Sequence, residues 1–259
     1  MTARTKIFGV PSKTLRVCLM LVAVCSMAAV PLRVSAKHSD LDVALGLAEM
    51  LRAARAVIGA NQDRINDPSI GDKGLSGDFV LEAALENFKN ATGQDVRGID
   101  PESHYGRLLT VQMEAIRQVM EDNKASINKA GVGFKGFVPA IFARLVNERF
   151  KELIGDEAEI KVTAPAALVR NRKARPDPWE TQAINDHLLS AEWIRDKVYA
   201  METTKHDRAA FRVLVPEYYT TGCMACHGEP KGEMDVTGYP KEGGKVGELG
   251  GVISVTLFH

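Results

Sequence analysis

Residues 54–75 read ARAVIGANQDRINDPSIGDKGL, and residues 116–137 follow the same pattern as IRQVMEDNKASINKAGVGFKGF. When residues 47–93 are compared with residues 109–155 at this spacing of 62 residues, 14 of 47 positions are identical. The identities include an asparagine before each turn and a Gly-x-Lys-Gly sequence within it, which chance resemblance between two amphipathic helices explains poorly. We therefore predict an internal repeat of two helical hairpins, residues 41–93 and 103–155, that pack against each other.

Apolar residues at helical spacing support this repeat. One stripe begins near Leu41, another follows Ser103, and further helices are predicted at 78–92 and 139–153. The stripes consist of Leu41, Leu45, Ala48, Leu51, Ala54 and Ile58 in the first copy and of Leu109, Met113, Ile116 and Met120 in the second. We expect both stripes to be buried, one against the other and one against the second half of the chain.

The second half of the chain changes to the alternating pattern of half-buried strands. Such segments lie at residues 159–163, 199–203, 211–215 and 252–257. A short connection at 205–208 predicts a hairpin between the middle two, and a helix is expected from Pro178. These patterns predict an α+β fold, in which a small, mostly antiparallel sheet has helices to one side. We expect residues 37–155 and 156–259 to form one compact unit.

Charged residues are unevenly distributed along the chain. Residues 1–36 contain five basic and no acidic residues, which leaves 28 basic and 33 acidic residues beyond them. Because that remainder has no basic excess, it is not expected to bind nucleic acid. The basic start, the uncharged run at 17–30 and the small residues before Ala36 are typical of a secretory signal peptide cleaved near Ala36.

The alternative interpretation of this amino-terminal segment is an uncleaved membrane anchor. Its uncharged run of 14 residues is shorter than the ~20 that a bilayer requires. We therefore predict a periplasmic protein whose mature chain has no membrane span.

Signal cleavage would remove two of the four cysteines and leave those of the sequence CMACH at residues 223–227. This spacing is typical of covalent c-type haem attachment. Cys223 and Cys226 can each add to a haem vinyl group, and His227 is then directed at the iron as the proximal ligand. The sequence therefore predicts one covalent haem c as the cofactor.

Three other interpretations of this motif fit its surroundings less well. A thioredoxin-like redox pair would lie just after a first strand, whereas this motif lies near the carboxyl end. A structural zinc site would need a fourth ligand and usually a second cysteine pair. A structural disulfide is possible, but it gives no role to His227.

Further residues connect the chain to a known family. The ordered set comprises Arg170-Asn171-Arg172, PDPWE at 176–180, CMACHG at 223–228, Gly238-Tyr239-Pro240, Gly247 and GGVISV at 250–255. With these residues the chain resembles bacterial c-type-haem domains of PAS-like fold, which occur as small exported proteins or as extracytoplasmic sensor modules. The resemblance implies a PAS-like sheet that carries a haem on Cys223 and Cys226, with His227 as proximal ligand and the amino-terminal helices covering the other side.

This resemblance does not identify the sixth ligand of the haem iron. Some members place a cysteine in the helical half that is suited to this role, but the predicted mature chain has no cysteine outside the motif. Met120, Met113 and His104 are the candidates on helices, although methionines on an apolar stripe are core residues by default. An open coordination site is the alternative.

Other polar residues of the second half of the chain are candidates for binding the haem propionates. Arg170 and Arg172 offer guanidinium forks, and Lys231 and Tyr239 offer an ammonium and a hydroxyl. Each of the four also suits a solvated surface or a helix cap. Lys73 and Lys135 of the repeated turns lack the spacing of a phosphate-binding loop, so we interpret them as turn residues.

The two repeated turns differ in their apolar content. The second carries Phe134 and Phe137 where the first carries Asp72 and Leu75. We expect both phenylalanines to face the core or the haem edge, and the first turn to be more exposed to solvent.

These observations favour a periplasmic single-haem protein that acts as a sensing or signalling module. A redox change, or a small gas ligand such as NO, CO or O₂, would alter the haem, and the signal would pass to a separate protein partner. The alternative is a soluble one-electron carrier with a redox partner. An enzyme would need an open iron site and usually a distal acid or base, and because the sequence identifies no such group we do not predict one.

Overall fold

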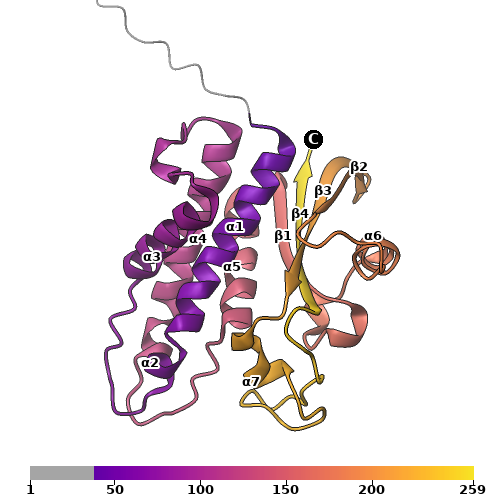
Figure 1. The fold of residues 1–259 in the computed structure, drawn as a ribbon. Coiled ribbons are helices and arrows are strands. Elements are labelled where there is room, and N and C mark those ends of the chain that lie inside the picture. Colours follow the sequence, from indigo (N-terminus) through magenta and orange to yellow (C-terminus); the bar gives the residue numbers. More distant parts are fainter. Residues whose placement is uncertain (1–37) are drawn as a thin grey trace, which may run out of the picture. The chain divides into compact units, whose positions relative to one another are not determined.

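The computed structural model of the protein describes residues 38–259, which belong to one compact unit. The predicted signal peptide lies outside the described residues. Within residues 38–259, helices at the amino-terminal end form a layer against a four-stranded antiparallel sheet (Figure 1). The α+β prediction is therefore confirmed. Among these residues, no helix combines the length and the apolar character needed to cross a bilayer.

Helices occupy the segments in which the apolar stripes predicted them. The helical layer contains α1 (Asp40–Ala60), α2 (Gln62–Asn66), α3 (Gly77–Thr92), the short 3₁₀ turn η1 (Val96–Gly98), α4 (His104–Ile127) and α5 (Pro139–Ile154). Ser39, Ser76 and Ser103 cap α1, α3 and α4, because each hydroxyl accepts a hydrogen bond from a backbone amide of the first turn. Pro139 starts α5, where its fixed φ suits the first helical position.

The four strands are longer than the alternating patterns predicted. They are β1 (Ala158–Thr163), β2 (Tyr199–Lys205), β3 (Arg208–Tyr218) and β4 (Leu249–Phe258), in the order β1-β4-β3-β2 with every neighbour antiparallel. The predicted hairpin joins β2 to β3. Its two turn residues, His206 and Asp207, have φ values of 53° and 60°, as a tight hairpin turn requires.

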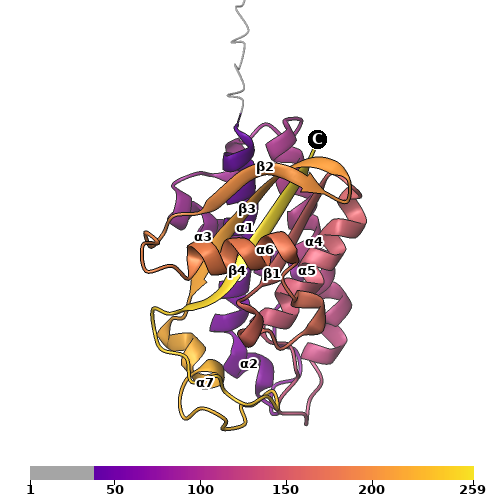
Figure 2. The same ribbon diagram turned by 90° about the vertical axis from the view of Figure 1, so that its right-hand side faces the viewer.

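Helices cover both faces of this sheet, so the expectation that they would lie to one side is wrong. One helix from each predicted copy, α1 and α5, packs on one face, and α3 and α4 lie behind them. The expectation that a single copy would face the sheet is therefore wrong. The opposite face is covered by α6 (Pro178–Ala183) and the π-helical turn η4 (Ile184–Leu188), as Figure 2 shows for α6.

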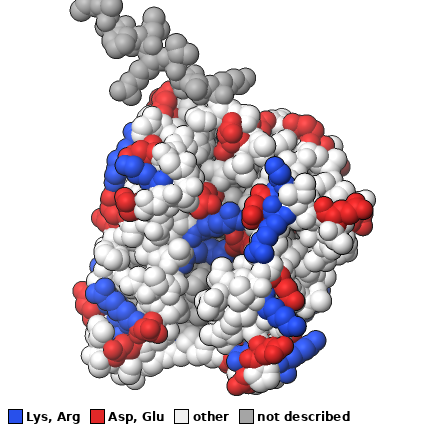
Figure 3. Space-filling model, viewed as in Figure 1, with Lys and Arg blue, Asp and Glu red and all other residues white. Residues whose placement is uncertain are grey.

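Alternation along the strands explains why both faces are covered. On β3, Val213 and Val215 belong to the large core with the helices, whereas Leu214 packs in a smaller cluster with α6 and η4. All residues of the two predicted stripes are buried except three that are half-buried, Leu41, Leu45 and Met113. On the face shown in Figure 3, acidic and basic side chains are interspersed and form no extended basic field.

The two Gly-x-Lys-Gly turns lie against each other and exchange equivalent hydrogen bonds. The Oδ1 atom of Asn66 accepts from the backbone N of Lys135 at 2.9 Å, and the Oδ1 atom of Asn128 accepts from the backbone N of Lys73 at 3.0 Å. Asn66 and Asn128 occupy the same position in the two copies, as do Lys73 and Lys135. The two turns are therefore related by a local two-fold arrangement.

Each turn is also closed around its own lysine. The ammonium of Lys73 donates to the carbonyl oxygens of Asp67 and Ile70, and the ammonium of Lys135 donates to the equivalent carbonyls of Lys129 and Val132. Lys73 is fully buried, whereas Lys135 is half-buried. These contacts agree with the interpretation of both lysines as turn residues, since each ammonium donates hydrogen bonds to carbonyl groups that the turn leaves without amide partners.

The expectation about the phenylalanines is wrong in part. Phe137 is buried and packs against Phe142 with ring centroids 6.0 Å apart, but Phe134 is 40% exposed. The first turn is not the more exposed one, because both Lys73 and Leu75 are buried. The cause is the shared conformation of the turns: positions 72 and 134 point outward, and positions 75 and 137 point into the helical core.

Replacing Lys73 with Met should lower the free energy of unfolding by about 2 kcal/mol, because two buried carbonyl groups lose their donor. Lys135→Met is the matched control, since it removes the equivalent bonds at a more exposed position and should cost less. Urea denaturation of both variants measures the difference. Equal losses, or an unchanged Lys73→Met variant, would contradict the role assigned to the buried ammonium.

Candidate functional site

The CMACH motif lies between β3 and β4, in the connection where the sequence predicted it. The chain leaves the sheet at Tyr218 and forms η5 (Thr221–Cys223) and α7 (Met224–His227). It then follows an irregular path through residues 228–248 before it enters β4. Figure 1 shows α7 beyond one end of the sheet, so the motif is held at the rim of the fold.

Both cysteines of the motif are free thiols and are half-buried. The Sγ atom of Cys223 lies 3.4 Å from the Oγ1 atom of Thr220. Burial, and secondarily the negative charge of Asp235, raises the pKa of the Cys226 thiol. Neither thiol is therefore committed to a disulfide, and Cys226 is held in its protonated form.

The His227 imidazole is fixed by two contacts. Its Nδ1 atom lies 2.9 Å from the Oε2 atom of Glu242, and its ring stacks on the ring of Tyr219 with centroids 5.2 Å apart. Since an ionised carboxylate can only accept, Nδ1 is the atom that donates to Glu242. The neutral tautomer that this bond selects has its lone pair on Nε2, which has no hydrogen-bond partner among the described residues. This is the arrangement of a histidine prepared to bind a metal.

Glu242 is in turn held by Arg170. The Nε atom of Arg170 lies 2.6 Å from Oε1 of Glu242, and Nη2 lies 3.0 Å from Oε2. Burial raises the pKa of Glu242, but hydrogen bonds from Arg170 and His227 outweigh it and hold the pKa below its ordinary value. The carboxylate therefore stays ionised and remains an acceptor for His227.

The same guanidinium organises the rest of the segment. Its Nη1 atom donates to Oδ2 of Asp235 at 2.6 Å, its Nη2 atom donates to the carbonyl of Cys226 at 2.7 Å, and its carbon lies 5.6 Å from the ring centroid of Tyr239. Burial opposes the ionisation of Asp235, but hydrogen bonds from Thr237 and Arg170 keep the pKa of that carboxyl well below its ordinary value. Arg170 thus joins α7 to both halves of the irregular segment.

Tyr219 forms the floor beneath His227. A Cβ atom on Gly244 or Gly250 would lie within 2.5 Å of the Tyr219 ring, so only glycine fits at these two positions. The Tyr219 hydroxyl is buried without a hydrogen-bond partner among the described residues, and burial raises the pKa of Tyr219 to about 12. The neutral Tyr219 hydroxyl therefore remains a hydrogen-bond donor without an acceptor, on the residue that stacks against His227.

Apolar side chains are unusually exposed around this site. Ten large apolar side chains of the described chain are exposed, and four of them lie in a short part of the irregular segment, namely Met234, Val236, Tyr239 and Val246. Such a concentration is typical of a surface that contacts a ligand or a partner. The residues present therefore suit a flat apolar group with an attached metal.

The structure brings together some of the residues predicted for the site. Arg170 and Tyr239 lie with Cys223, Cys226 and His227. Arg172 does not join them: it is exposed in the 3₁₀ turn η3 (Arg172–Ala174), and its side chain makes no hydrogen bond or ion pair with a described residue.

The three candidates for the sixth ligand all lie on α4. Met120 is fully buried in the helical core, Met113 lines a cavity between α3 and α4, and His104 is exposed at the start of the helix. Figures 1 and 2 both place α4 in the helical layer, apart from α7. The structure does not bring these side chains to the motif.

Sequence reasoning missed Glu242, Asp235 and Tyr219. Glu242 and Asp235 lie in a segment without periodicity, where a carboxylate has no sequence signal that distinguishes it from a solvated one. Tyr219 had a weak signal, since it directly follows a strand and precedes the motif by four residues.

Comparison with known proteins gives one family. A family described as Tll0287-like matches residues 99–257, a span that includes α4, strands β1 to β3, all but the last residue of β4, and the CMACH motif. No similar curated protein and no similar solved structure was found.

Replacing Arg170 with Met should lower the free energy of unfolding by about 3 kcal/mol, because the enclosed carboxylate of Asp235 loses its cation. The segment 228–248 should also become sensitive to proteolysis. Arg172→Met is the matched control and should change neither property. Limited proteolysis followed by mass spectrometry locates the cleavage, and a variant Arg170→Met as resistant as the parent would contradict the organising role of this side chain.

Proposed function

The chain belongs to the Tll0287-like family, and from this membership and the geometry of α7 we propose that it is a single-haem c-type protein. Cys223 and Cys226 would attach the haem through thioethers, and His227 would be the proximal iron ligand. The observation that carries the proposal is the imidazole of His227, oriented by Glu242 with its Nε2 atom free.

Several features of the chain's own residues support this assignment. The thiols are free and lie within one turn of each other, as attachment to two vinyl groups requires. The exposed apolar side chains near α7 would be covered by the macrocycle. When bound, the haem supplies an iron centre that can change oxidation state or take up a small gas molecule.

Glu242 has a positioning role in this proposal. A carboxylate that accepts from the Nδ1 atom of a ligating histidine raises the basicity of that ligand. Arg170 also forms an ion pair with Glu242, and this positive charge reduces the increase in the basicity of His227. The pair would therefore adjust the reduction potential while it fixes the ring plane of His227.

We also propose that the sheet is PAS-like. The support is the four-stranded antiparallel sheet, packed on one face by α1 and α5 and on the other by α6, with the CMACH motif in the connection between β3 and β4. Export to the periplasm, supported by the sequence of residues 1–36, would place the motif where c-type haem proteins are found.

A link between the motif and the helical layer favours sensing over simple electron transfer. Glu217 precedes the haem segment on β3, and Arg52 and Arg55 of α1 both bind its carboxylate, with 2.6 Å between Arg52 Nε and Oε1. Two residues further on, Tyr219 stacks on His227. A change at the iron would therefore reach α1 through a short, packed path, and from there a separate redox or signalling protein. A one-electron carrier is the alternative, and it has no need of such a path.

Mutation of the attachment cysteines tests the cofactor. Haem should stay bound to the parent protein in denaturing electrophoresis, because thioether bonds survive unfolding. The double variant Cys223→Ser/Cys226→Ser should lose this covalent haem, while His227→Ala should retain some haem with an altered absorption spectrum. Parental amounts of covalent haem in the double variant would overturn the proposal.

Ligand binding separates a gas sensor from a carrier. If the haem senses gas, the reduced protein should take up CO or NO, with a shift of the Soret band that follows the gas concentration. A carrier with six firm ligands should show no shift under the same conditions. Glu217→Gln should leave the Soret shift unchanged. It should weaken the change that gas binding causes in the near-ultraviolet circular dichroism of the helical layer. Glu233→Gln, an exposed change in the same half of the chain, is the control and should alter neither the Soret shift nor the circular dichroism.

A further inference from the structure

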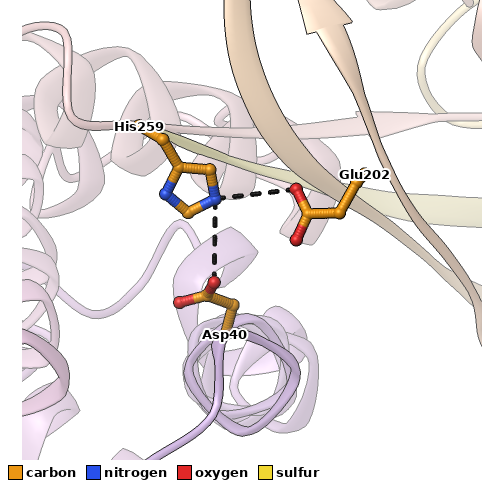
Figure 4. A group of neighbouring side chains, drawn as sticks. All are labelled: Asp40, Glu202 and His259. Atoms are coloured by element: carbon orange, nitrogen blue, oxygen red, sulfur yellow. Dashed lines mark ion pairs between the residues drawn. The ribbon is translucent and has the colours of Figure 1, made fainter.

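Three side chains converge at the end of the molecule opposite the CMACH motif. They are Asp40 at the start of α1, Glu202 in β2 and His259 after β4, and their nearest ligand atoms all lie within 4.8 Å of one another. The Nε2 atom of His259 is 3.7 Å from Oδ2 of Asp40 and 3.7 Å from Oε2 of Glu202 (Figure 4). One nitrogen and two oxygen donors thus gather within 4.8 Å of one another.

The backbone on all three sides of this group is fixed. The amide of His259 donates to the carbonyl of Ala209 at 3.0 Å, and Glu202 is paired with Phe211 in the β2–β3 ladder. Asp40 follows Ser39, the capped start of α1. Because three separate elements supply the donors, the group is assembled by the tertiary fold and not by a single flexible loop.

The charges of the group are unbalanced. Within residues 38–259, Asp40 and Glu202 form ion pairs with His259 alone, whereas the carboxylates of Glu217 and Glu242 each bind arginine. Two carboxylates thus share one imidazole, which can itself supply a neutral nitrogen. The group lacks a full positive charge that a bound cation would provide.

We propose that Asp40, Glu202 and His259 bind one divalent transition-metal ion, with Zn²⁺ as the best match. Imidazole favours Zn²⁺ over Mg²⁺ or Ca²⁺, and carboxylate oxygens complete common zinc sites. Tetrahedral ligands about 2.1 Å from zinc lie about 3.4 Å apart. The two separations from His259 are 3.7 Å and all three lie within 4.8 Å, so the donors must close by up to about 1.4 Å, and water takes the fourth position.

The site would join the two layers of the fold. Asp40 belongs to the helical layer, while Glu202 and His259 belong to the sheet side. Figure 1 shows the carboxyl end of the chain and α7 at opposite ends of the sheet, so the metal site is separate from the motif. A bound ion would fasten the start of α1 to the middle of β2 and the end of β4.

Titration of the haem-loaded protein with Co²⁺ and Zn²⁺ tests the site. We expect one equivalent to bind, with weak visible d–d bands for Co²⁺ and no intense thiolate band in the near ultraviolet, because the donors are nitrogen and oxygen. Zn²⁺ at 100 times its dissociation constant should raise the melting temperature by about 5 °C. Repeating the titration with Cys223→Ser/Cys226→Ser should give the same result, which makes the test independent of haem.

Matched variants identify the ligands. His259→Ala, Asp40→Asn and Glu202→Gln should each weaken binding at least about tenfold. His206→Ala is the control, because His206 is exposed beside Asp207 in the β2–β3 turn and should bind no metal. Undiminished binding in the His259→Ala variant, a thiolate band that disappears with the cysteines, or no binding at all would overturn the proposal.

Discussion

The guanidinium of Arg170 is the charge on which the irregular part of the structure depends. Residues 228–248 have no helix, and their one pair of bridged residues is Met234 with Pro240. Backbone hydrogen bonds such as that from Gly232 to Lys241 close local turns within this segment. Arg170 adds the side-chain contacts that hold these turns together, because it binds two carboxylates of this segment and one carbonyl of α7 at the same time. The orientation of His227 follows from this anchoring, through Glu242.

The regular part of the fold depends on apolar burial, and there the sequence was informative. Stripes of 3.6-residue period predicted α1, α3, α4 and α5 nearly to their ends, and alternation predicted the four strands. The strands extend further because their ends still pair at residues without apolar alternation, such as Glu217 with Gly251. Within the predicted strands, the polar residues Arg212 and Ser254 are buried on the outer face. Arg212 tolerates that position since Asp177 and Glu180 bind it.

Of the candidate site, the sequence could predict the residues of the haem-attachment motif, because that motif has a fixed spacing. Two thiols and an imidazole within five residues are a local signal, so Cys223, Cys226 and His227 could be named. Arg170 and Tyr239 were named through the family resemblance. Glu242 could not, because its role comes from a contact that joins distant parts of the chain. The failed expectation for Phe134 has a similar cause, since an apolar side chain at a turn gives no indication of its direction.

The exchanged asparagines of the helical layer have a consequence for its origin. Asn66 binds the turn of the second hairpin and Asn128 binds that of the first, so each turn takes one hydrogen bond from the other copy. Reciprocal contacts of this kind are those that identical subunits make across a two-fold axis. A single ancestral hairpin could therefore have formed the same contacts with a second copy of itself. On this view, the helical layer is a former dimer interface retained within one chain, and a substitution in either copy is felt by both.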